Sequence, residues 1–179
     1  MAIFAASFTV AQSSDCTTLT FTDTSNYNTI ASPTANTDSI AISSFDTRQF
    51  IVSDSNYNVI DTISLTGSAL TGSYALSADA WLSVDLSLTN TSPVRSASAV
   101  HSVLSTCFLE TCFADLVAEA ECGCGCGCSS GNCNNTQSDT MLLLQFIKAA
   151  QIFSEYSNPV MAQRQLDAGT ALCNENQSS

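Results

Sequence analysis

Cysteine is the residue type with the greatest chemical potential in this chain, because several of the nine cysteines lie close together. The run from Cys122 to Cys128 reads CGCGCGC, and another cysteine follows closely. Alternating glycines leave such a loop supple enough to wrap several thiolates around a soft cation such as Zn²⁺. The pattern predicts a candidate metal site made of Cys122, Cys124, Cys126, Cys128 and Cys133.

Two other interpretations of these loop cysteines stay open. Structural zinc sites usually combine two C-x-x-C pairs spaced well apart, and this run contains neither pair. The thiols could instead be free in a reducing compartment, or form disulfides that staple helix ends under oxidising conditions. Cys107, Cys112 and Cys173 differ from the loop group, because they fall on expected helices. We predict that these three are small buried hydrophobic residues.

Motifs for catalysis are sparse. The single histidine, His101, is expected at the start of a helix, and Cys107 six residues later would not lie beside it. The sequence contains no G-x-S-x-G nucleophile elbow, phosphate-binding loop or dinucleotide-binding glycine motif. Aspartates that flank the expected strands are typical of turns rather than of a glycosidase pair or a calcium site. We therefore predict a protein without enzymatic activity.

The charge balance argues against nucleic-acid binding, and the lack of a long apolar stretch argues against a membrane-spanning protein. Sixteen acidic residues oppose four basic ones, which gives a net charge of −12. Phosphate binding needs clustered Lys and Arg, and this chain offers no such cluster. No stretch approaches the roughly 18 apolar residues that span a bilayer. The opening MAIFAASFTV lacks a basic region and a full apolar core, so we interpret it as a first strand rather than a signal peptide.

The amino-terminal half shows the period-two alternation of half-buried strands. The clearest case places Leu82, Val84, Leu86 and Leu88 on one face, between polar residues on the other. The SNYN segments that begin at Ser25 and Ser55 favour turns between strands. Residues 1–93 are therefore predicted to form an antiparallel β-sandwich, Ig-like or jelly-roll-like. Its seven or so strands are expected at 4–11, 17–22, 37–44, 48–54, 58–65, 70–75 and 80–88.

After Ser92-Pro93, the apolar residues recur at the spacing of a helix. We predict a first helix that is capped by Ser96 or Ser98 and runs to about Glu121. A second helix is expected from residue 138 or 139 to 156, and a third begins at Asn158-Pro159 and ends near Cys173. Residues 94–179 would thus form a small three-helix domain with a Cys-rich loop at 122–133. The predicted fold class is α+β.

Three segments resemble the β-domain of virion tail proteins from crAss-like phages and related tailed phages of the Bacteroidota. They read SFTVAQSSDCTTLTFTDTSNYN, FDTRQFIVSDSNYNVIDTISL and DAWLSVDLSLT. The family has a Phe-x-x-Arg turn before a strand and a D-S-x-x turn after it, and its carboxy-terminal part is a small helical unit with cysteines. The matching residues here are Phe45, Asp46, Thr47, Arg48, Asp54 and Ser55, with AQRQLDAGTALC at 162–173 as the closing helix.

The resemblance implies a virion protein at the head–tail junction or in the tail, made in the host cytoplasm. It would form a cyclic homo-oligomer of about twelve subunits and contact neighbouring portal, tail or ring proteins. Two alternatives remain open. One is a head fibre or capsid decoration protein that binds host glycans through Tyr27 and Tyr57, and the other is a metal-thiolate protein that uses the loop cysteines.

Overall fold

The computed structural model describes residues 5–25, 45–91, 94–123 and 133–177. Two compact units divide the chain. The first comprises Met1–Ser77 and Leu82–Val103, and the second comprises Ala78–Trp81 and Leu104–Ser179. The main division therefore falls between Val103 and Leu104, at the end of the last strand, whereas we predicted it after residue 93.

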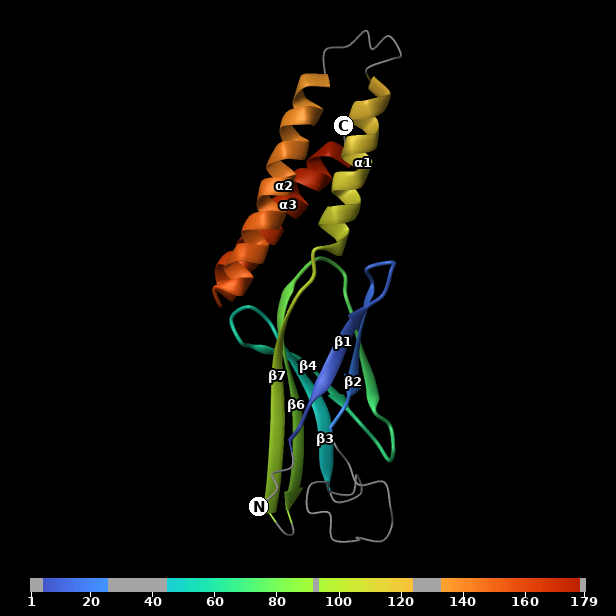
Figure 1. The fold of residues 1–179 in the computed structure, drawn as a ribbon, viewed down its shortest axis with the longest axis vertical. Helices are drawn as coiled ribbons and strands as arrows, with labels where there is room; N and C mark the ends of the chain where they lie inside the picture. The colour runs from blue at the N-terminus through green and yellow to red at the C-terminus, as the bar shows by residue number, and fades with distance from the viewer. Residues whose placement is uncertain (1–4, 26–44, 92–93, 124–132, 178–179) are drawn as a thin grey trace. The chain divides into compact units, whose positions relative to one another are not determined.

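The first unit contains seven strands in two antiparallel sheets (Figure 1). One sheet has the order β1-β2-β5, and the other has the order β4-β3-β6-β7. The α+β prediction is confirmed, because three helices follow these strands. The predicted strand at 37–44 lies outside the described residues. The strands are β1 (Phe8–Gln12), β2 (Thr18–Asp23), β3 (Thr47–Ser53), β4 (Val59–Ser64), β5 (Thr71–Ala75), β6 (Trp81–Thr91) and β7 (Val94–Leu104).

The prediction of a helix from Ser96 or Ser98 was wrong, because residues 94–104 form strand β7. The apolar residues Val100 and Leu104 fit a helical stripe, but the segment VRSASAVHSVL also alternates in the way that a strand does. A run this short satisfies both periods, so its pairing partner decides the outcome. The neighbouring strand β6 supplies that partner across a connection of only two residues. His101 therefore lies on a strand and not at a helix start.

The core of the sandwich is formed by the inward faces of β2, β3 and β6. The four leucine and valine residues expected on the buried face of β6 are each 3% exposed or less. The Phe50 ring of β3 lies 5.3 Å from that of Phe21 and 5.4 Å from that of Phe8, so aromatic contacts link the two sheets. Full burial of side chains of this size contributes about 2 kcal/mol each.

The second unit contains α1 (Cys107–Gly123), α2 (Cys133–Glu155) and α3 (Pro159–Gln177). Its core combines residues of all three helices, among them Leu109, Leu143 and Leu166. Helix α3 begins as predicted, because the Asn158 side chain accepts a hydrogen bond from the Met161 amide at 3.2 Å.

Helix α1 takes its amino-terminal cap from a distant residue. The Asp79 carboxylate accepts hydrogen bonds from the Phe108 and Leu109 amides at 3.1 and 2.8 Å, and from the Ser105 hydroxyl at 2.8 Å. Asp79 is itself buried and belongs to the short stretch that precedes β6. A helix that begins at Cys107 thus has its first free amides satisfied by a carboxylate.

Cys112 and Cys173 form a disulfide that joins α1 to α3. We predicted both as small hydrophobic residues. They are buried as expected, at 8% and 7% exposed, but the prediction missed their bond. Cys16 and Cys107 are disulfide-bonded as well, so the prediction of Cys107 as a small buried hydrophobic residue also missed a bond, and its side chain is only half-buried.

Candidate functional site

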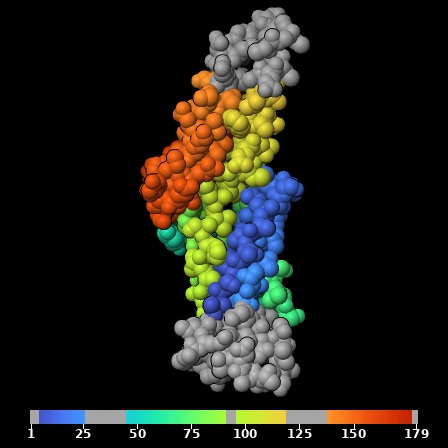
Figure 2. Space-filling view, viewed as in Figure 1, coloured from blue at the N-terminus to red at the C-terminus, as the bar shows by residue number. Residues whose placement is uncertain are grey.

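The two edge strands of the four-stranded sheet carry apolar side chains that face solvent. Among the described residues, β4 lies at one edge and β7 at the other. Val59 and Ile60 of β4 are 62% and 46% exposed, and Val100 of β7 is 62% exposed. Figure 2 shows β7, in yellow-green, on the surface of the sandwich. An edge strand offers unpaired backbone donors and acceptors, so long exposed edges are potential pairing sites.

The two edges run in opposite directions. Strand β3 is antiparallel to both β4 and β6. Strand β7 follows β6 after two residues, and so short a connection allows only antiparallel pairing. Four strands in strict alternation leave β4 and β7 antiparallel to each other. This property of the sheet decides how a second copy could join it.

Charge is distributed unequally between the edges. The β7 sequence contains Arg95 and His101 but no acidic residue. The β4 sequence contains Asp61 as its one charged residue, and Asp61 is exposed. In a chain with a net charge of −12, a strand of eleven residues without a carboxylate is a place where two copies can approach with little repulsion.

His101 shows no arrangement for catalysis among the described residues. Its ring packs against that of Phe8 in an edge-to-face geometry, with centroids 4.4 Å apart. Phe8 belongs to β1 and is 3% exposed. The contact places His101 between the β7 edge and the neighbouring sheet, where it covers an aromatic core residue.

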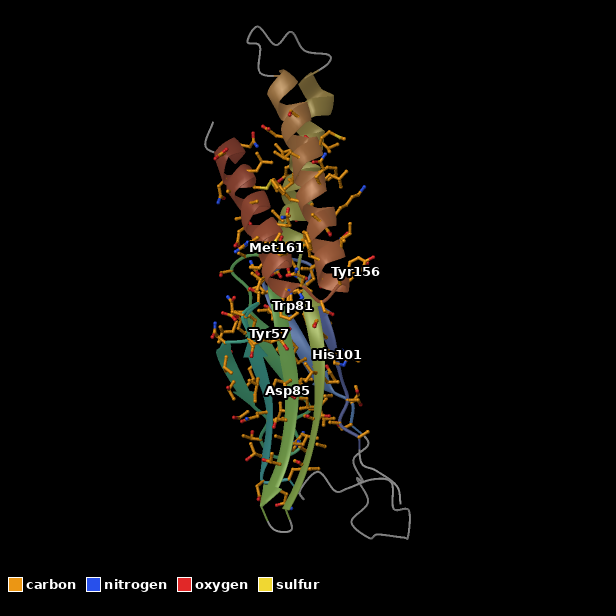
Figure 3. All side chains as sticks on the ribbon, turned by 90° about the vertical axis from the view of Figure 1, so that its left-hand side faces the viewer. Tyr57, Trp81, Asp85, His101, Tyr156 and Met161 are labelled. Carbon is orange, nitrogen blue, oxygen red and sulfur yellow. A yellow bond between two sulfur atoms is a disulfide. The ribbon has the colours of Figure 1, made fainter. Side chains whose placement is uncertain are left out.

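The outer face of the four-stranded sheet carries a carboxylate with incomplete hydrogen bonding. Asp85 of β6 lies opposite Ile51 of β3, and one of its carboxylate oxygens is buried without a hydrogen-bond partner. Desolvation by this burial raises the pKa of Asp85. Figure 3 labels Asp85 midway along the sandwich. The sequence pattern placed Asp85 on the polar face of β6, but alternation alone could not show that one oxygen is buried.

A buried ion pair holds the two sheets together. The Arg48 guanidinium on β3 lies 3.5 Å from the Asp23 carboxylate at the end of β2. It also donates hydrogen bonds to the carbonyls of Gly67 and Ala69, at 2.9 and 2.7 Å. Asp23 in turn accepts from the Ser25 amide at 2.9 Å. The arginine of the Phe-x-x-Arg motif thus lies inside a strand and fixes the position of β3 and its neighbour β4.

A tight turn presents a tyrosine at the surface. The Asp54 carboxylate accepts hydrogen bonds from the Asn58 side chain and amide and from the Asn56 amide, at 3.1, 2.9 and 2.8 Å. These bonds, with those from Asn58 contributing most, lower the pKa of Asp54. Tyr57 has a φ of 62° and is 63% exposed. The SNYN segment at Ser55 is therefore a turn, and Tyr27 of the other SNYN segment lies outside the described residues.

Two of the five predicted metal ligands lie on described helices. Cys122 lies in the last turn of α1 and Cys133 is the first residue of α2. Cys124, Cys126 and Cys128 lie outside the described residues. In the described part of the chain, no three His, Cys, Asp or Glu side chains are grouped to hold a metal ion. The zinc site at these cysteines stays a prediction.

No described helix is long and apolar enough to cross a membrane. Comparison with protein-family models, with curated proteins and with solved structures finds no match to this chain. The resemblance to crAss-like phage tail proteins therefore stays a prediction that rests on the quoted motifs.

Proposed function

We propose that this chain is a structural virion protein of a tailed bacteriophage. In this proposal it forms a homo-oligomeric ring at the head–tail junction or in the tail, next to portal, tail or ring proteins, and has no enzymatic activity. The observation that supports it best is the pair of exposed, oppositely directed edge strands β4 and β7 on one sheet. Two different surfaces at opposite ends of one sheet suit a head-to-tail interface, and such interfaces form rings when the rotation between subunits closes.

The composition of the chain also supports an assembly role. Only 11% of the residues are charged, whereas 45% are hydrophobic. Exposed apolar side chains occur on both units, including Val100 on β7, Met141 and Ile152 on α2, and Tyr156 directly after α2. A monomer has little use for so many exposed large apolar residues, whereas a subunit enclosed by neighbours buries them.

Native mass spectrometry together with particle purification tests this proposal. The expected results are a closed oligomer with a mass that is a multiple of 18.8 kDa, and the same chain in purified virions. A strictly monomeric product that is absent from virions would refute the proposal.

A second candidate function is a head fibre or capsid decoration protein that binds host glycans. The exposure of Tyr57 in its rigid turn favours it, because aromatic rings on rigid turns bind sugar faces well. Tyr57→Ala should then abolish attachment to host cells and leave particle assembly intact. Loss of assembly without loss of attachment would favour the ring.

A further inference from the structure

We infer that neighbouring copies of this chain join by continuing the four-stranded sheet, with β7 of one copy paired antiparallel to β4 of the next. The inference rests on the proposed homo-oligomer and specifies its interface. The occupant of each edge is a second copy of this chain. Backbone hydrogen bonds between β7 and β4 would supply the affinity, and the side chains of the two strands would supply the choice of partner.

Strand direction supports this pairing. Because β4 and β7 are antiparallel to each other within one copy, a second copy that keeps the same strand direction presents its β4 antiparallel to the first copy's β7. The ladder then continues in the stronger, antiparallel pattern. The joined sheet also keeps its buried face on one side and its polar face on the other. Each subunit uses both edges once, so repetition of the contact generates a ring when the rotation from one subunit to the next closes.

Side-chain chemistry distinguishes this pairing from like-with-like contacts. A β4–β4 contact would bring two copies of the exposed Asp61 together, and like charges on neighbouring strands repel. In the β7–β4 contact, Asp61 instead meets a strand whose ionisable residues are Arg95 and His101. The exposed Val59 of β4 would lie against the strand that carries Val100, so apolar side chains of both edges lose part of their contact with water.

The length of the strands sets the extent of the contact. Strand β4 has six residues and β7 has eleven, so β4 limits the new ladder. In the sequence of β7 no proline interrupts the ladder and no lysine protects the edge, although both are common on edges that must stay unpaired. Strand β4 lacks both residues too.

Edge-blocking lysines test the inference in the full-length protein. Val100→Lys should block β7, and Val59→Lys should block β4, because each places a charge at an exposed position of one edge. Each variant alone should shift from the closed oligomer to a monomer in native mass spectrometry. The matched control is Leu70→Lys between β4 and β5, which adds the same charge at an apolar site of the sandwich that is 40% exposed but lies on neither edge strand, and it should leave the oligomer unchanged. Circular dichroism confirms that all three variants are folded.

Mixing the two blocked variants distinguishes head-to-tail from like-with-like pairing. Val100→Lys retains an intact β4 and Val59→Lys retains an intact β7, so the mixture should form a one-to-one heterodimer and nothing larger. Homodimers of either variant alone would overturn the inference. Hydrogen exchange gives a second readout, because the amides of β4 and β7 should exchange at least tenfold more slowly in the oligomer than in the blocked monomers.

The possible failures separate the inference from the proposed function. A wild-type oligomer that persists in both Val100→Lys and Val59→Lys would overturn the β7–β4 interface and leave the ring standing. A wild-type protein that is monomeric and absent from virions would overturn both.

Discussion

The sandwich unit and the helical unit are each stabilised internally, but by different interactions. In the sandwich, large side chains fill the space between two sheets, and a buried ion pair connects β3 to β2. Its fully buried residues include Leu19, Phe21, Phe50, Val52, Val84, Leu86 and Leu88. In the helical unit, fewer large residues are fully buried, and a disulfide joins α1 to α3. Among the described residues, the helical core holds fewer fully buried large side chains, and a disulfide is a common way to stabilise a small core.

This difference has a consequence for assembly. The edges that we propose as interfaces, β4 and β7, belong to the unit with the larger core. A rigid sheet keeps an edge ready for pairing without an additional entropic cost, which favours association.

The largest expected effect is on the helical unit. The double variant Cys112→Ala/Cys173→Ala removes a cross-link between residues 61 positions apart. For a closed loop of this length, the expected loss is about 4 kcal/mol of unfolding free energy. Hydrogen exchange resolved by peptide should show the loss in α2 and α3, while amides in β3 and β6 keep their protection. Equal loss in β3 and β6 would show that the two units unfold together rather than separately.

The second effect concerns the ion pair of the sandwich. Arg48→Ala leaves the Asp23 carboxylate buried without its partner and removes the donor to the Gly67 and Ala69 carbonyls. An uncompensated buried charge costs about 3 kcal/mol or more. Urea unfolding of the isolated protein measures the loss.

Two further variants control the Arg48 experiment. Arg48→Met/Asp23→Asn removes both charges and should recover most of the lost stability, because the penalty comes from the unpaired carboxylate. Arg164→Ala removes an exposed arginine of α3 and should change stability by less than about 0.5 kcal/mol. A double variant as unstable as Arg48→Ala would show that packing of the arginine, rather than its charge, holds the sheets together.

Strand patterns could be predicted where one face is buried and the other is wet. The alternation in β6 gave its inward residues correctly, and turn residues marked most boundaries. The alternation in β7 was missed, since a segment of eleven residues with three valines fits both periods until a neighbour selects one. Which strands are edges could not be predicted, because the orders β1-β2-β5 and β4-β3-β6-β7 follow from tertiary pairing.

Contacts between residues far apart in the chain could not be predicted from the sequence either. The Cys112–Cys173 disulfide depends on how α1 and α3 pack, and no spacing rule connects residues so far apart. The cap on α1 comes from Asp79, which lies 30 residues before the Leu109 amide that it binds. Local capping signals such as Ser96 and Ser98 therefore predicted the wrong helix start.

The third prediction concerns this cap. Asp79→Ala removes the acceptor for two α1 amides and for the buried Ser105 hydroxyl. Loss of a cap together with an unsatisfied hydroxyl costs about 2 kcal/mol. Amides in the first turn of α1 should exchange faster, and Asp79→Asn should lose less because it keeps an acceptor oxygen. Unchanged exchange in Asp79→Ala would show that Thr106, whose hydroxyl bonds Glu110, caps the helix sufficiently.

The smallest expected effect is the pH dependence that Asp85 gives to the sandwich. Burial raises the pKa of Asp85 in the folded protein above its unfolded value, so the folded state binds the proton more tightly. This group therefore favours folding most at low pH, and its contribution falls as the pH rises through the folded pKa. Asp85→Asn should be more stable than the wild type at neutral pH, by less than about 1 kcal/mol because solvent screens the site. The two proteins should converge below pH of about 4.

Asp54→Asn provides a matched control of opposite sign. Hydrogen bonds from Asn58 and Asn56 lower the pKa of Asp54, so its contribution to stability is present above the unfolded pKa and is lost as the pH falls through the folded pKa. Asp54→Asn should therefore be less stable than the wild type at neutral pH, whereas Asp85→Asn should be more stable. Urea unfolding between acidic and neutral pH measures both. Parallel curves for Asp85→Asn and the wild type would show that the buried oxygen of Asp85 carries no electrostatic penalty.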